Sequence, residues 1–130
     1  MTGVQTCALP IFAVGTFGPS ATISNNLKAR EAQNVEALKE QLKKIISHVP
    51  KDWGTRTDLA MSKANSEVFT DDGGDRPKAP NILLVFTDGK PIKMAKDKKP
   101  WVEFEDSIKK LEVSFLFLSN LLPKECEKEV

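Results

Sequence analysis

Hydroxyl and carboxylate side chains stand at two places in this sequence where they could hold a metal ion. Asp88 follows the apolar run NILLVF, and Thr55, Thr57 and Asp58 lie in the segment GTRTD just before a helical pattern. Oxygen ligands of these types suit Mg²⁺ or Mn²⁺ better than zinc. Magnesium takes about six oxygens in an octahedral array, so waters, further side chains or a partner's carboxylate would have to complete such a site.

The first elements that could position these residues are two strands and a helix. The stretches FAVGTFG and ATISNNL predict short strands joined as a hairpin. Residues 34–50 then predict an amphipathic helix with Asn34 as its N-cap and Pro50 as its stop. The apolar face of that helix consists of Val35, Leu38, Leu42, Ile45, Ile46 and Val49.

The rest of the chain alternates helices and strands. Residues 55–69 predict a helix capped by Thr55 or Thr57, and NILLVF is typical of a parallel strand covered on both faces. A third helix is expected in WVEFEDSIKKLE and another buried strand in VSFLFLS. This alternation predicts an α/β fold with a mostly parallel sheet and helices on both faces. Ligand sites of such sheets lie beyond the carboxyl ends of the strands, where Asp88 is expected.

Composition argues against several classes of function. The net charge of +1, with 40% hydrophobic and 28% charged residues, is that of an ordinary globular protein and gives no sign of a nucleic-acid partner. Lysines cluster from Lys90 to Lys99, but Asp97 interrupts them and no aromatic residues alternate with them, which favours a solvated loop over an anion-binding patch. No apolar run approaches the roughly 18 residues of a membrane span. Asp88 has no accompanying nucleophile or base, so we expect no enzymatic activity.

Two segments together carry a resemblance to a known family. GTRTDLAMSKANSEVF, followed by GGDRPKAPNILLVFTDGKP, resembles the central part of a von Willebrand factor type A domain. The resemblance extends from about Phe12 to Leu111, and it implies a truncated version of that Rossmann-like α/β fold. In this family an apolar strand that ends in T-D-G and a G-x-T-x-T-like turn both contribute to a metal-ion-dependent adhesion site.

The resemblance implies roles for three residues of this chain. Carried over by motif, the metal-ligating threonine is Thr55, and the aspartate, which is usually bound through a water, is Asp88. Thr57 matches the helix-capping threonine of the same turn. The metal implied is Mg²⁺, or Mn²⁺ in its place.

The chain also departs from the family pattern. A complete domain begins with a strand ending in D-x-S-x-S and a helix, which would supply three of the five ligand side chains, and neither is found here. The opening MTGVQTCALPI lacks the basic residues of a signal peptide and resembles a translated sequencing adapter. We therefore expect a non-native segment at residues 1–11, a partial domain at 12–118 without its last helix, and an irregular tail at 119–130. Metal binding by this fragment is expected to be weak or absent.

The resemblance implies a protein-binding function. The GGDRPKAPN spacer is most similar to those of collagen- and matrilin-like domains, which predicts a parent protein in the extracellular matrix or at the cell surface. Its partner would be a matrix or cell-surface protein whose carboxylate completes the metal shell. The alternative is an intracellular type A domain that acts as a module for assembling protein complexes.

Overall fold

The computed structural model describes residues 9–48, 52–87, 90–92, 94–111 and 114–119. Four strands and four α-helices occur there, together with one short π-helix, η1. Their order is β1 (Val14–Phe17), β2 (Ala21–Asn25), α1 (Arg30–Gln33), α2 (Val35–Ser47), α3 (Thr57–Lys63), η1 (Ala64–Val68), β3 (Ile82–Thr87), α4 (Phe104–Lys109) and β4 (Ser114–Ser119). The expected irregular tail beyond Ser119 and most of the expected non-native opening lie outside the described residues.

The described strands form two pairs. β1 and β2 make the antiparallel hairpin that the sequence predicts, with Phe17 opposite Ala21. β3 and β4 run parallel, from the pair Ile82 and Ser114 to the pair Thr87 and Ser119. Among the described residues no ladder joins the two pairs, so the sheet is not continuous there.

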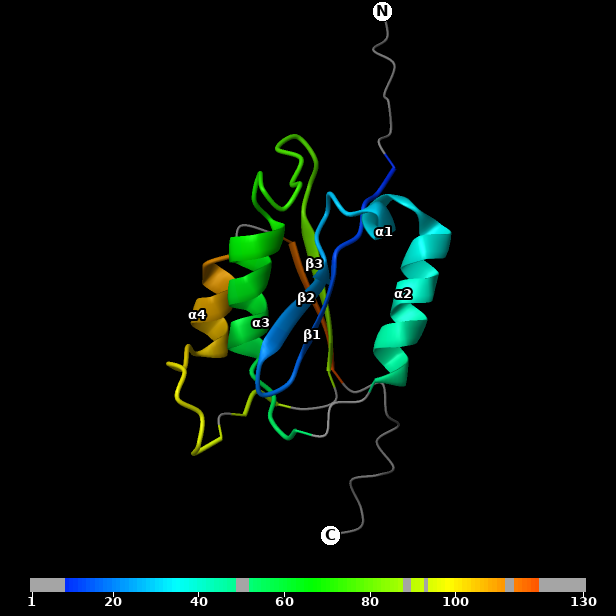
Figure 1. Ribbon diagram of the computed structural model, residues 1–130. Helices are drawn as coiled ribbons and strands as arrows, with labels where there is room; N and C mark the ends of the chain where they lie inside the picture. The colour runs from blue at the N-terminus through cyan, green and yellow to red at the C-terminus, as the bar shows by residue number, and fades with distance from the viewer. Residues whose placement is uncertain (1–8, 49–51, 88–89, 93, 112–113, 120–130) are drawn as a thin grey trace, which may run out of the picture.

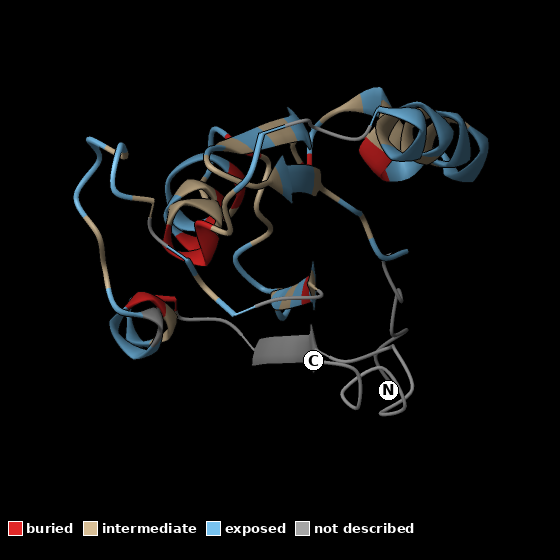
Figure 2. Cartoon of the chain, turned by 90° about the horizontal axis from the view of Figure 1, so that it is seen from below, coloured by how far each residue is buried: buried red, intermediate tan, exposed pale blue. Residues whose placement is uncertain are grey.

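Helices lie on both sides of the strands (Figures 1 and 2). α3 and α4 lie on one side, and α2 lies on the other. This arrangement and the parallel pair confirm the predicted α/β class. Within the described ranges, no helix is long and apolar enough to cross a membrane.

The core lies where α3 and η1 meet the strands and α4. Met61 is 1% exposed and is the largest fully buried apolar side chain among the described residues. Ala64 and Val68 continue the same buried face into η1, where the amide of Phe69 donates to the carbonyl of Ala64 at 2.9 Å. Val85 of β3 and Leu111 after α4 are also buried. The small side chain of Ala64 lets η1 pack closely against its neighbours.

The two-sided covering predicted for β3 is wrong for the described residues, and the predicted apolar face of α2 is present but only partly covered. None of the side chains of α2 is buried, and Ile46 is 74% exposed. Alternate residues of β3, at Ile82, Leu84 and Phe86, are exposed as well. Periodicity correctly identified the helix and the strand. Within the described ranges, Leu38, Leu42 and Ile45 of α2 are half-buried, whereas Ile46 and the outer face of β3 are exposed.

Candidate functional site at the carboxyl ends of β1 and β3

Thr55 lies between the segments that follow β1 and β3. The carbonyl of Thr55 accepts a hydrogen bond from the amide of Ile92 at 2.9 Å, and the amide of Arg56 donates to the carbonyl of Gly18 at 2.7 Å. Gly54 has a φ of +148°, and a Cβ there would lie 3.0 Å from the Cα of Pro19, so only glycine fits this turn without strain. The structure therefore places Thr55 at the strand ends where the sequence predicted a ligand site.

The predicted capping role of Thr55 or Thr57 is wrong. Thr57 is the first residue of α3, the N-cap position is held by Arg56, and no side chain caps the helix. The hydroxyl of Thr57 is buried and has no hydrogen-bond partner in the described part of the chain. The reason is that the helix begins two residues after Thr55, so neither hydroxyl stands at the position from which a cap can reach the free amides.

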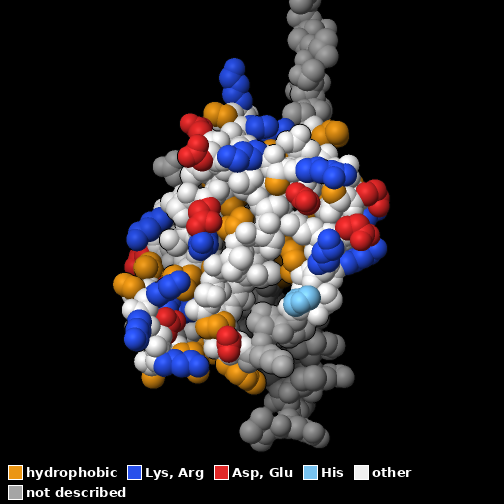
Figure 3. Space-filling model, viewed as in Figure 1, with side chains coloured by type: hydrophobic (Ala, Val, Ile, Leu, Met, Phe, Trp, Pro, Cys, Tyr) orange, Lys and Arg blue, Asp and Glu red, His pale blue; other side chains and the backbone are white. Residues whose placement is uncertain are grey.

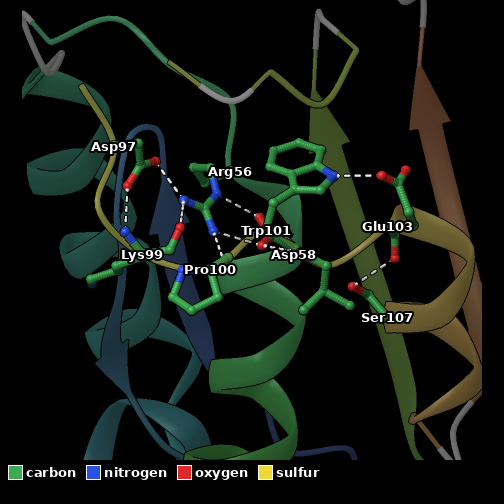
Figure 4. Close-up of polar contacts among 9 residues, drawn as sticks. Arg56, Asp58, Asp97, Lys99, Pro100, Trp101, Glu103 and Ser107 are labelled. Carbon is green, nitrogen blue, oxygen red and sulfur yellow. Dashed lines mark hydrogen bonds and ion pairs between the residues drawn. The ribbon is translucent and has the colours of Figure 1, made fainter. Parts of the chain in front are cut away.

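A buried arginine dominates the polar contacts beside Thr55 (Figure 4). Arg56 is 0% exposed, and its Nε and Nη2 donate to the two carboxylate oxygens of Asp58 at 2.8 and 2.7 Å. This side-on, bidentate pairing matches the planar guanidinium to the planar carboxylate. The sequence indicated Asp58 as a candidate metal ligand, but both of its carboxylate oxygens accept hydrogen bonds from Arg56.

The remaining donors of Arg56 bind the segment before α4. Nη1 donates to Asp97 at 2.5 Å and to the carbonyl of Lys99 at 3.4 Å, while Nη2 also donates to the carbonyl of Pro100 at 2.7 Å. The guanidinium carbon lies 5.3 Å from the centre of the Trp101 ring, within range of a cation–π contact. We call Arg56, Asp58, Asp97 and Trp101 the Arg56 junction. It attaches residues 97–102 to the start of α3.

Arg56 and Asp58 each stabilise the charged form of the other. The hydrogen bond from Arg56 to Asp58 is the main cause that raises the pKa of the guanidinium above its ordinary value, against the opposing effect of burial. Burial would raise the pKa of the Asp58 carboxyl, but hydrogen bonds from Arg56 and from the amide of Val102 outweigh it and hold that pKa below its usual range. Arg56 and Asp58 therefore both remain charged at neutral pH.

Comparison with known proteins assigns the chain to a family. The family model described as the von Willebrand factor type A domain matches residues 11–113. The chain belongs to this family. It is also 39% identical to Matrilin-3 of Gallus gallus over 57 residues, which make up 41% of this chain and 13% of Matrilin-3. The type A resemblance and its matrilin-like character are thus confirmed, and the chain spans only a small part of the relative's length.

The described residues of this type A domain do not by themselves form a metal site. Thr55 offers one hydroxyl, Asp58 is paired with Arg56, and Asp88 lies outside the described residues. Within the described ranges no group of three or more His, Cys, Asp or Glu side chains could hold a metal ion. A divalent cation needs about six oxygens, so the donor set seen here is too small.

Sequence reasoning missed the central residue of this end of the type A domain. Arg56 stands between the two threonines that match the family motif, and its partner Asp97 is 41 positions away in the chain. The sequence pattern indicated Asp97 only as an interruption of a lysine cluster. The one local signal was Asp58 two residues after Arg56, but that spacing alone does not indicate a buried pair.

Proposed function

We propose that this type A domain is a non-enzymatic module that binds a protein ligand in the extracellular matrix or at the cell surface. The observation that carries the proposal is the family match over residues 11–113, and the similarity to Matrilin-3 supports the matrix location over an intracellular assembly role. The ligand would bind at the end of the domain that holds Thr55, because ligand sites of α/β sheets lie beyond the carboxyl ends of their strands.

We further propose that Thr55 and Asp88 are what this chain contributes to a family-type Mg²⁺ site. In a complete site, the metal would provide positive charge and an open coordination position for an Asp or Glu of the ligand. Three of the five ligand side chains of the family site belong to a D-x-S-x-S segment that does not occur in residues 1–130, so we expect this chain to bind Mg²⁺ or Mn²⁺ weakly or not at all. Metal-dependent adhesion is thus proposed for the parent protein.

The test begins with the source transcript, because residues 1–11 resemble a translated adapter. Sequencing upstream of the codon for Phe12, with a primer inside NILLVFTDGKP, should reveal a strand ending in D-x-S-x-S. The domain extended by that segment should bind Mn²⁺ in a calorimetric titration. Thr55→Ala and Asp88→Ala should each weaken binding by at least about tenfold, because even changes to outer-shell partners of a metal site cost about 10–100-fold in affinity.

Thr22→Ala is the matched control, because Thr22 is an exposed hydroxyl on β2 and should leave Mn²⁺ affinity unchanged. If the transcript encodes MTGVQTCALPI, or if the extended domain binds Mn²⁺ equally well without Thr55 and Asp88, metal-dependent adhesion through these residues is wrong.

A further inference from the structure

The segment from Lys90 to Lys99 presents a more basic surface than its sequence suggests. Its described lysines are all exposed, and among the described residues none of their ammonium groups forms an ion pair; they are Lys90, Lys96, Lys98 and Lys99. Blue side chains over this segment are visible at the lower left of Figure 3. Described lysines elsewhere, such as Lys39 and Lys43 on α2, instead pair with a glutamate one helical turn away.

The acidic residue that interrupts the lysines, Asp97, is largely buried. The side chain of Asp97 is only 12% exposed, and its Oδ2 accepts a hydrogen bond from Nη1 of Arg56. Its Oδ1 accepts one from the amide of Lys99 at 3.2 Å. A ligand approaching this segment would therefore contact ammonium groups and would meet no exposed carboxylate from Asp97.

The charge balance remains positive when the whole Arg56 junction is included. Arg56 and the carboxylates of Asp58 and Asp97 together carry one negative charge, which is buried, against four exposed ammonium groups. Lys96, Lys98 and Lys99 are at most three positions apart in the chain, and at 0.1 M salt exposed charges are largely screened only beyond about 10 Å. The segment should therefore attract an anionic partner.

Apolar side chains at the same end of the domain favour a polypeptide as that partner. Ile92, inside the lysine segment, is 49% exposed, and its backbone is bonded to Thr55. Trp53, two residues before Thr55, is 84% exposed. Exposed aromatic and aliphatic side chains beside lysines can bury against the side chains of a peptide, whereas a sulfated polysaccharide offers them little apolar surface.

We propose that the four described lysines, together with Ile92 and Trp53, form a docking surface for an acidic polypeptide segment that also carries apolar side chains. We call it the lysine surface. The inference rests on the proposed function only in taking the ligand to be a protein. It requires no metal, because the attraction comes from the ammonium groups and the contact area from Ile92 and Trp53.

The experiment uses the full chain in EDTA at about 50 mM salt, where screening leaves surface charges effective. The probe is the labelled peptide EELEELEELEEL, and binding is followed by fluorescence anisotropy. The double variant Lys96→Gln/Lys98→Gln should weaken binding by about fivefold or more, and added salt should weaken wild-type binding further. The matched control is Lys44→Gln/Lys78→Gln, which removes two exposed, unpaired lysines elsewhere in the described ranges and should change affinity less than about twofold.

A second pair of measurements tests the apolar contribution. Trp53→Ser should weaken binding of EELEELEELEEL and leave unchanged the binding of a peptide made only of glutamate. Circular dichroism must match for all variants, so that a loss of folding is not read as a loss of binding.

Several results would overturn the inference. These are no binding of the acidic peptide by wild-type chain, equal losses in the two double variants, an unchanged affinity in Trp53→Ser, or binding of dextran sulfate without binding of the peptide. Because EDTA is present, failure of metal-dependent adhesion would leave this result standing, and failure here would leave the Mn²⁺ titration standing.

Discussion

The Arg56 junction and the outer surfaces of α2 and β3 differ sharply in how many of their side chains have partners. In the junction, every N–H group of a fully buried guanidinium has an acceptor, and both oxygens of Asp58 and Asp97 are engaged. On α2 and β3, large apolar side chains such as Ile46 and Phe86 face outward with nothing described upon them. The stability of the described structure should therefore be concentrated around α3, and the other surfaces should tolerate change.

The largest effect should come from Arg56→Met. The substitution leaves the carboxylate of Asp58, whose side chain is 2% exposed, without its cation. Removing one partner of a buried ion pair costs about 3–5 kcal/mol, a large part of the 5–15 kcal/mol that holds a typical domain folded. Urea unfolding followed by circular dichroism should show the loss, or show a chain already unfolded in buffer.

Lys39→Met is the control for that change. It breaks an exposed pair with Glu36 and should cost only roughly 0.3 kcal/mol. If the two variants unfold at the same urea concentration, the junction is not the centre of stability that its geometry indicates.

The next largest effect should be Met61→Ala, measured beside Ile46→Ala. Met61 is 1% exposed, so its truncation leaves a cavity and should cost about 2–5 kcal/mol. Ile46 is 74% exposed, and its truncation should change the free energy of unfolding by less than about 0.5 kcal/mol. Comparable costs at the two sites would mean that α2 is covered in solution, and the contrast between the two regions would fail.

Acid should remove part of what the junction contributes. The pKa of Asp58 is lowered in the folded chain, so the stabilisation is present above the unfolded pKa of about 3.9 and is lost as the pH falls through the folded value. The urea concentration at the unfolding midpoint, measured at pH values from 6 to 3, should therefore decrease once the pH is below about 4. Asp58→Asn should show a shallower fall than wild type, whereas the exposed Asp106→Asn should follow the wild-type curve.

A smaller loss than at Arg56 or Met61 should follow Asn34→Ala at the start of α2. The side chain of Asn34 accepts the amide of Ala37 at 3.0 Å, and loss of such a cap costs about 1 kcal/mol. Asn34→Ser should retain most of this contribution, because serine can accept the same hydrogen bond. A drop in helical circular dichroism for alanine alone would show that α2 is held by its own cap more than by packing.

The sequence predicted the elements of this fold better than their surroundings. The hairpin, the parallel strand NILLVF and the helix beginning after Asn34 depend on local patterns, and the structure contains all three. Whether the apolar face of α2 is covered depends on what lies opposite, which periodicity cannot reveal. The same distinction explains why the exposed side of β3 was unexpected.

In the candidate site, too, the sequence predicted the features that depend on local patterns and missed those that depend on distant residues. Thr55 lies at the carboxyl ends of β1 and β3 because turn and strand signals fix it there. Asp58 was misread as a possible ligand because its pairing with Arg56 depends on a guanidinium that is buried only when residues 97–102 fold over it. Contacts between positions 41 apart leave no pattern in a single sequence. The expected role of Asp88 remains a prediction, since that residue lies outside the described ranges.

The lengths of the connections within the two strand pairs also determine when each pair can form during translation. β1 and β2 are separated only by residues 18–20, so their hairpin can close within about 1–10 μs of both strands becoming available. β3 must wait for residues 88–113 and then for β4, which at ribosomal speed takes on the order of a few seconds. During that interval the edge of β3 that pairs with β4 is open to chaperones, so NILLVF should be cleaved by protease faster in a chain ending at Leu111 than in one extending past Ser119.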